Sequence, residues 1–385
     1  MAYLMLTSFW IAAAAVSVPD CQSTAPTQNT LCGIQTANLI VPSNPFGLVY
    51  ASEDVAFASI GIGIVGVLNT STFTPTLIRE IVVPAPFYQG SFGVTGLAIT
   101  RNKQTVYVSV GPGAVAVDVQ KAVAGEDSIV GFLNGTVGTT SIEATLSSDD
   151  RYIFVSQEYG SKSTGYHGAI EVFNVNPANN GSVQSTYVGF ISLGVSVVGT
   201  ALSSDGSKLY ATSELANYTS TQGTLSILDV EILKTDPSKA LLASVDAGCG
   251  PVRVTVSPNG KHVWVTARES NKLLAFDAAK LESNQSNALV ASVQVGTSPV
   301  SVTFVNHGRH IITADSNRFN YTNTTTGLTV VDAEAALNGK QGFPQIPTGL
   351  FPREFAVSPD GKTLLVSEYT SEAIQAVDVS QLAWD

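Results

Sequence analysis

Residues 254–265, with the sequence VTVSPNGKHVWV, consist of an apolar segment, a Ser-Pro-Asn-Gly turn and a second apolar segment. The same pattern returns at residues 355–366 as FAVSPDGKTLLV. The residues equivalent to Ser257 are spaced by 47 to 56 positions and are Ala51, Thr100, Ser147, Ser203, Ser257, Val305 and Ser358. A strand-rich repeat of this length, present seven times, predicts an all-β fold, a seven-bladed β-propeller.

Each repeat fits four strands. The turn between the first two strands contains Asn, Asp or Gly, which tolerate the positive φ of a tight hairpin. The third strand ends near an Asp in the clearest copies: Gly223–Asp229, Lys272–Asp277, Gly327–Asp332 and Glu372–Asp378. An outer strand such as Ala288–Val295 then leads into the next repeat. Seven units of about 50 residues fill the chain as one propeller domain, which we place at residues 36–385.

The two ends of the chain indicate how the ring closes. After Ser358 only three strands fit before the chain ends at Asp385. The segment Thr36–Val41 has no other partner, so we expect it to supply the outer strand of the last blade, which would protect an open sheet edge. The alternative is that Thr36–Val41 is a loop.

The composition agrees with many short, tightly packed strands. Charged residues make up 13% of the chain, hydrophobic residues 44%, and the formal net charge is −11. A negative protein without a Lys/Arg cluster does not suit nucleic acid or an anionic membrane, so we expect neither as a partner.

The N-terminal residues indicate the secretory pathway. Residues 1–18 are almost uncharged and resemble a signal peptide, although a retained segment is the alternative because no positive charge precedes the apolar stretch. In the arm at residues 19–35, Cys21 and Cys32 form a plausible local disulfide, which leaves Cys249 as a buried thiol. Sequons for N-glycosylation support a secreted or extracellular location and occur at Asn69, Asn134, Asn180, Asn217, Asn284, Asn320 and Asn323.

The mouth of the central channel is the strongest candidate site. The residues four positions before each repeat's anchor should line it, and these are Gly47, Gly96, Glu143, Gly199, Arg253, Ser301 and Glu354. A charge at such a crowded ring costs free energy unless it is paired or used. Glu143, Arg253 and Glu354 are therefore candidate catalytic residues, and an ion-pair plug that locks the channel is the structural alternative.

Loops on the same face add further candidates. Glu158 is a possible acid or base, and the possible substrate-binding residues are Tyr159, His167, Arg268, Tyr369, Phe87, Tyr88 and Phe351. An apolar, aromatic rim around a few charges is the usual composition of a small-molecule pocket. The remaining histidines, His262, His307 and His310, fall on the opposite face as structural residues. The three cysteines lack a C-x-x-C spacing, which excludes a cysteine-type zinc site.

The repeats also carry a family resemblance. The Val-Ser-Pro-Asn/Asp-Gly-Lys turn, the following Val-Trp-Val-Thr or Leu-Leu-Val-Ser, and the Val377-Asp378 strand end resemble the YVTN and lactonase-like propellers over Phe46–Asp378. Within that superfamily, the secreted character and the Glu/Arg mouth are similar to the fungal propeller hetero-Diels–Alderases of tropolone sesquiterpenoid biosynthesis. This likeness implies fold more strongly than function.

The resemblance implies a dehydration followed by a cycloaddition. A hydroxymethyl tropolone would lose water to give a quinone methide, which adds to the alkene of a humulene-like terpene. Arg253 could hold the acidic oxygens while Glu143, Glu158 or Glu354 exchanges the proton. Phe87, Tyr88, Tyr159 and Phe351 would form the walls, and we expect no metal and no other cofactor.

Two other functions stay open. A metal-dependent lactonase would need oxygen ligands such as Glu143, Asp315, Asn317 and Glu354, although Arg253 in the same ring would repel the cation. A non-catalytic propeller could bind a ligand, protein or glycan on the same face. We expect a small apolar or aromatic partner at the mouth, and the sequence leaves the oligomeric state open.

Overall fold

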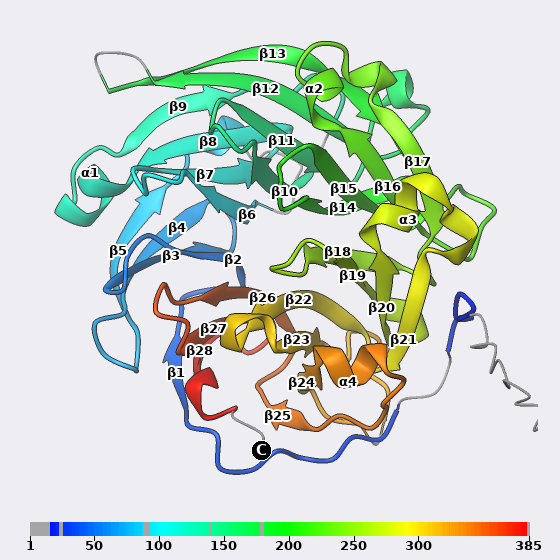
Figure 1. Cartoon of the computed structure of the whole chain (residues 1–385). Coiled ribbons are helices and arrows are strands. Elements are labelled where there is room, and N and C mark those ends of the chain that lie inside the picture. The colour runs from blue at the N-terminus through cyan, green and yellow to red at the C-terminus, as the bar shows by residue number, and fades with distance from the viewer. Residues whose placement is uncertain are drawn as a thin grey trace, which may run out of the picture.

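The computed structural model describes residues 16–22, 26–87, 93–138, 140–177, 181–322 and 324–382. Seven four-stranded antiparallel sheets surround a central axis, as Figure 1 shows from the face that carries α2, α3 and α4. The predicted seven-bladed β-propeller is therefore confirmed. No helix in the described ranges is long and apolar enough to cross a membrane.

The strands of each blade follow one another from the channel outward. Blade 1 contains β2 (Pro45–Tyr50), β3 (Val55–Ile60), β4 (Ile64–Asn69) and β5 (Thr76–Val82). Blade 2 contains β6 (Val94–Ile99), β7 (Thr105–Val110), β8 (Gly113–Asp118) and β9 (Ile129–Leu133). Blade 3 contains β10 (Ser141–Leu146), β11 (Tyr152–Gln157), β12 (Ala169–Pro177) and β13 (Val183–Ser192). Blade 4 contains β14 (Val195–Leu202), β15 (Lys208–Leu215), β16 (Thr224–Asp229) and β17 (Leu241–Asp246). Blade 5 contains β18 (Pro251–Val256), β19 (His262–Ala267), β20 (Lys272–Asp277) and β21 (Leu289–Gln294). Blade 6 contains β22 (Pro299–Val305), β23 (His310–Asp315), β24 (Gly327–Asp332) and β25 (Gln345–Pro347). Blade 7 contains β26 (Pro352–Val357), β27 (Thr363–Glu368), β28 (Ala373–Asp378) and β1 (Thr36–Ile40).

Short helices lie between the strands. The α-helices are α1 (Val119–Ala124), α2 (Val230–Leu233), α3 (Ala278–Ser283) and α4 (Ala333–Leu337). The 3-10 helices are η1 (Ala85–Phe87), η2 (Lys162–Thr164), η3 (Pro237–Lys239), η4 (Arg268–Ser270), η5 (Gln285–Asn287), η6 (Asn306–Gly308) and η7 (Val379–Gln381). The Asp that ends a third strand is the N-cap of the helix that follows, as Asp277 shows by accepting a hydrogen bond from the Lys280 N–H.

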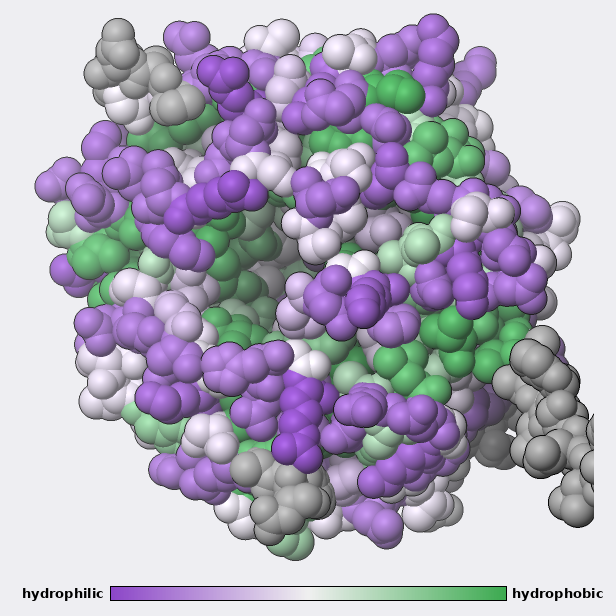
Figure 2. All heavy atoms as spheres, viewed as in Figure 1, coloured by the Kyte–Doolittle hydropathy of each residue, from purple (hydrophilic) through white to green (hydrophobic). Residues whose placement is uncertain are grey.

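The repeated turn is built by its own polar side chains. The Ser257 hydroxyl donates to Oδ1 of Asn259 at 2.8 Å, and the same oxygen accepts from the Lys261 N–H. Gly260 adopts a φ of +71°, which a side chain would strain. These bonds stabilise the hairpin, which lies on the face shown in Figure 2. Over the centre of that face is a recess with hydrophobic residues on its wall.

The hydrophobic core lies between the blades. Each sheet is apolar on both faces and packs against its two neighbours, so that Phe57 and Val65 of blade 1 and Val106 and Val115 of blade 2 belong to one buried cluster. This arrangement explains the near-continuous apolar strands in the sequence.

Every inner strand contains a β-bulge where it approaches the channel. A bulge leaves a backbone N–H without its strand partner. In blade 5 the Thr266 hydroxyl of β19 accepts from the Arg253 N–H at 3.0 Å and donates to the Val300 carbonyl of blade 6 at 2.7 Å. The same bridge to the next blade is made by the hydroxyls of Ser59, Thr212 and Ser367.

The ring closes as expected. β1 pairs antiparallel with β28, with Thr36 opposite Val377 and Ile40 opposite Ala373. The N-terminal segment therefore completes the last blade, and the prediction for Thr36–Val41 is confirmed. In Figure 1 the blue arm continues from β1 past β25 along the outside of the ring.

The predicted Cys21–Cys32 disulfide is wrong. Cys21 is bonded to Cys249, with their Cα atoms 5.3 Å apart, and Cys32 is an exposed free thiol. The arm does not form a local loop, because the Gln22 N–H donates to Glu269 of blade 5 and the Leu31 N–H donates to Gln345 of blade 6. This extended path carries Cys21 to the connection between blades 4 and 5. Residues 1–15 lie outside the described ranges, so the signal peptide stays a prediction.

We expect Cys249→Ala to lower the free energy of unfolding by about 2–5 kcal/mol, because the disulfide closes a long loop between the arm and blade 5. Thermal unfolding without reductant measures the effect, and Cys32→Ser serves as the control with an unchanged midpoint. Peptide mapping that recovers Cys21 linked to Cys32 would contradict the assignment.

Thr266→Val tests the bridge between blades. The variant keeps the shape of the side chain but leaves the Arg253 N–H and the Val300 carbonyl without this partner, so we expect a loss of about 1–3 kcal/mol in denaturant unfolding. Thr255→Val on β18 is the control, because no hydrogen bond of its hydroxyl is found among the described residues. Equal losses in the two variants would argue against the bridge.

Candidate functional site

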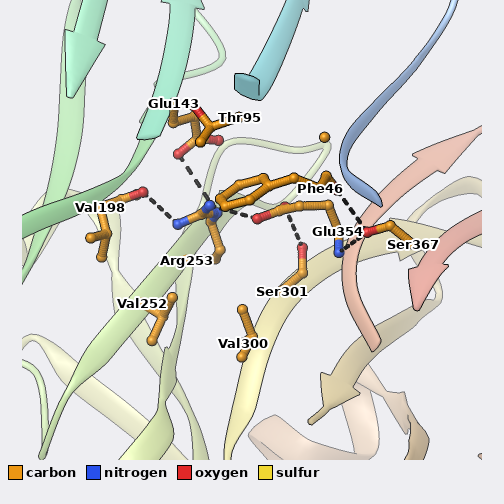
Figure 3. Close-up of polar contacts among 12 residues, drawn as sticks. Phe46, Thr95, Glu143, Val198, Val252, Arg253, Val300, Ser301, Glu354 and Ser367 are labelled. Carbon is orange, nitrogen blue, oxygen red and sulfur yellow. Dashed lines mark hydrogen bonds and ion pairs between the residues drawn. The ribbon is translucent and has the colours of Figure 1, made fainter. Parts of the chain in front are cut away.

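The predicted charges at the channel mouth converge. Arg253 is only 4% exposed, and its Nη2 lies 2.5 Å from Oε1 of Glu354. Its Nε lies 3.9 Å from Oε2 of Glu143, and its Nη1 donates to the Val198 carbonyl (Figure 3). Glu354 also accepts from the Ser301 hydroxyl at 3.2 Å. The guanidinium of Arg253 on blade 5 therefore contacts blades 3, 4 and 7 across the axis, and Glu354 links this cluster to blade 6.

The glycines of the same ring mark close approaches between inner strands. A Cβ atom at Gly47 would lie 2.5 Å from the Thr95 carbonyl oxygen, and one at Gly96 would lie 2.5 Å from that of Ile142. The narrow axis requires small residues there, as the sequence indicated. The charged side chains extend from blades 3, 5 and 7 into the space that these glycines leave.

Glu143 lies in an unusual electrostatic environment. Burial raises the pKa of Glu143 to about 7, and Arg253 and the Thr200 N–H, which donates to Oε2 at 2.7 Å, oppose that rise. Glu143 can therefore exchange a proton near neutral pH. Its catalytic role, like those of Arg253 and Glu354, stays a prediction.

A second ring lies one residue earlier on the inner strands. It is mostly apolar and includes Phe46, Ile142, Val198, Val252 and Val300 in one buried cluster. Arg353 is the charged member of this ring and stacks on Phe46, with its guanidinium carbon 3.7 Å from the ring centroid. Arg353 is not among the residues predicted from the sequence, because a bulge turns two consecutive residues toward the axis and strand alternation does not predict this.

Charged side chains surround a small cavity above this apolar ring. Its volume is about 20 Å³, and its lining includes Glu158, Glu214, Arg268, Arg318 and Arg353. Arg253 reaches it from the ring below. Burial and the neighbouring Glu214 raise the pKa of Glu158 above its usual range. The cavity has room for about one water molecule or the charged end of a larger ligand.

The structure brings some of the predicted binding residues together. Phe351 and Tyr369 pack against each other with ring centroids 5.5 Å apart, beside Arg353. Arg268 lines the cavity and pairs with Glu214 at 2.9 Å. Tyr159 is exposed and hydrogen-bonds to Glu158.

Other predicted binding residues lie elsewhere. Phe87 stacks on Phe132 of the outer strand β9, with centroids 4.0 Å apart, so it packs between blades 1 and 2. His167 forms a hydrogen bond with the Leu193 carbonyl, and its ring packs against that of Tyr218 above blades 3 and 4. Tyr88 falls outside the described ranges.

The oxygen ligands considered for a lactonase do not form one group, because Glu143 and Glu354 pair with Arg253 whereas Asp315 lies elsewhere. Asp315 is buried within blade 6, and its carboxylate accepts hydrogen bonds from Thr313, Thr329 and Gln345. Burial raises the pKa of Asp315 to about 6. Among the described residues, no group of three His, Cys, Asp or Glu side chains is arranged to hold a metal ion.

The sequons mostly lie on the surface. Asn134, Asn217, Asn284 and Asn320 are exposed, and Asn69 is half-buried. Asn180 and Asn323 fall outside the part of the chain that the structure describes. The four exposed side chains are accessible to modification, and glycosylation stays a prediction.

Comparison with known proteins supports the fold alone. No protein-family model matches this chain, and no curated protein sequence matches it. A structure of Kuenenia stuttgartiensis hydrazine synthase contains a chain with a TM-score of 0.66 and 15% identity, covering 89% of this chain and 97% of that one. A crystal structure of the mitotic checkpoint complex contains another, with a TM-score of 0.63 and 16% identity, covering 98% and 99%.

Glu143→Gln tests the raised pKa. Between about pH 4.5 and 7 the folded protein holds a proton that the unfolded chain has released, so Glu143 lowers the free energy of unfolding as the pH rises. We expect urea unfolding of the wild type to show a larger loss from pH 5 to pH 8 than unfolding of the variant. Glu126→Gln, at an exposed position, is the control, and parallel profiles for wild type and Glu143→Gln would contradict the shift.

Proposed function

We propose that the channel mouth is the active site of a pericyclase-type enzyme that performs a hetero-Diels–Alder cycloaddition. The substrates would be a hydroxymethyl tropolone, dehydrated to a quinone methide, and a humulene-like terpene. The observation that carries this proposal is one cavity that combines a protonatable carboxyl, arginines and aliphatic walls. The proposal invokes no cofactor.

Glu158 is the best placed acid. It lines the cavity, whereas Glu143 and Glu354 lie in the ring below and pair with Arg253. Because its pKa is raised, Glu158 carries a proton more often than an exposed glutamate does. An arginine would bind the tropolone as its oxyanion, and Glu158 would donate its proton to the leaving hydroxyl. As the C–O bond breaks, the electrons of the oxyanion form the quinone methide, so the products are water, the neutral quinone methide and the Glu158 carboxylate.

The apolar ring supports the second step. Ile142, Val198, Val252 and Val300 keep water away from the centre of the mouth, which would protect a quinone methide from hydration. The cycloaddition itself needs no nucleophile. It needs two reactants held in one relative orientation, and such orientation can lower a barrier by several kcal/mol.

A second candidate is a propeller that binds a small ligand without chemistry. The cavity volume of about 20 Å³ favours it, because both reactants fit only if the loop side chains move outward. Arg318 lines the cavity and is exposed at its edge.

We also propose that the protein passes through the secretory pathway. The Cys21–Cys249 disulfide suits an oxidising compartment, and the exposed sequons suit glycosylation.

Glu158→Gln tests the enzymatic proposal. Purified wild-type protein should convert a hydroxymethyl tropolone and humulene to cycloadduct faster than the uncatalysed mixture, as measured by chromatography with mass detection. The variant should be slower by about 100-fold or more, because it has lost its general acid. Glu334→Gln, exposed on α4 at the opposite face, should keep the wild-type rate. Wild-type protein that forms no cycloadduct above background would leave ligand binding as the function.

A further inference from the structure

Arg353 lies in an aromatic environment at the channel mouth. Its guanidinium carbon is 3.7 Å from the centroid of Phe46, 5.4 Å from that of Tyr369 and 5.5 Å from that of Phe351. The rings come from blade 1 and from two segments of blade 7. Aromatic faces attract a cation but provide none of the hydrogen bonds that a guanidinium normally makes.

The polar groups of Arg353 lack partners within the described ranges. No hydrogen bond or ion pair of its guanidinium is found there; the residue is half-buried, and its Nε is fully buried. The Nε atoms of the buried Arg253 and Arg268 also lack a hydrogen bond, but the terminal nitrogens of these two residues are paired. Arg253 pairs with Glu354 and donates to Val198, and Arg268 pairs with Glu214. Buried polar groups in proteins are nearly always hydrogen-bonded, and a buried cation without an anion is costly.

The charges around Arg353 act in both directions. Arg253 and Arg318 repel it, whereas Glu354 and Glu158 attract it. Glu354, the carboxylate adjacent in sequence, is however held by Arg253. Burial, followed by Arg253, lowers the pKa of Arg353 to about 10, so the side chain is still charged at neutral pH. An incoming anion would relieve this repulsion and supply the missing acceptors.

We infer that Arg353 anchors an anion site, and that its ligand is a carboxylate or a similar planar oxyanion on a flat apolar body. A guanidinium presents paired N–H donors that match two oxygens of a planar anion. The cavity beside Arg353 admits only the charged end of a ligand, and Phe351 and Tyr369 are placed to contact a flat body behind it. This inference rests on the proposed function for the location of the site and specifies the substrate class.

The assignment changes the role expected of Arg253. Both terminal nitrogens of Arg253 are engaged, by Glu354 and by the Val198 carbonyl, so a ligand would have to break contacts that join several blades. Arg353 can bind the same oxygens without that cost. Arg253 then attracts the anionic ligand electrostatically without direct contact, and its own contacts hold the inner strands together.

Isothermal titration calorimetry with benzoate and with benzamide, its neutral counterpart, tests the site. We expect wild-type protein to bind benzoate at least tenfold more tightly than benzamide, and added salt to weaken benzoate alone. Arg353→Gln should weaken benzoate by about tenfold or more and leave benzamide unchanged. Arg101→Gln makes the same charge change at an exposed position on the opposite face and should bind benzoate as the wild type does.

Arg353→Lys keeps the test decisive if the Gln variant does not fold. Lysine retains the charge but not the paired donors, so benzoate affinity should lie between those of wild type and the Gln variant. Wild-type protein that does not distinguish benzoate from benzamide would overturn the inference. Undiminished benzoate binding by folded Arg353→Gln would overturn it as well.

The outcome is separable from that of the proposed function. If the wild type binds benzoate through Arg353 but forms no cycloadduct, the anion site stands and the pericyclase proposal fails. If cycloadduct forms while benzoate binding does not depend on Arg353, the anion site is wrong and the enzyme proposal stands.

Discussion

The β-bulge in each inner strand is the feature on which the rest of this structure depends. Seven sheets can meet around a narrow axis only if their inner strands bend there, and the bend leaves one N–H per strand without its sheet partner. A Ser or Thr on the second strand lies beside each bulge: Ser59, Ser109, Ser156, Thr212, Thr266, Thr313 and Ser367. Where the hydroxyl also reaches the next blade, one small side chain stabilises both its own sheet and the ring.

The same bulges create the candidate site. Two consecutive residues of each inner strand face the axis, which produces an apolar ring with Arg353 above a ring with Glu143, Arg253 and Glu354. In blade 4 the Val198 carbonyl accepts from Arg253 rather than from a neighbouring hydroxyl. Part of the charge cluster therefore performs the structural task that hydroxyls perform elsewhere, which favours the ion-pair plug for these three residues.

The residues of the channel mouth therefore form two layers, a lower one that stabilises the fold and an upper one that is available to a ligand. Arg253 and its two glutamates hold inner strands together, while Glu158 and Arg353 line a cavity with fewer internal contacts. Groups that the fold does not use are the ones available to a ligand. The raised pKa of Glu158 and the missing partners of Arg353 both point to this upper layer.

The sequence by itself determined the propeller, the number of blades, the closure by Thr36–Val41 and the convergence of Glu143, Arg253 and Glu354, because all of these follow from a repeat with a fixed register. The tertiary structure decided the partner of Cys21, since the arm takes an extended path past Glu269 and Gln345 that no local pattern specifies. It also decided that Phe87 packs on Phe132 and that Arg353 faces the axis. Repeats encode contacts within a blade and between equivalent positions, whereas bulges, loops and the arm depend on which blades become neighbours.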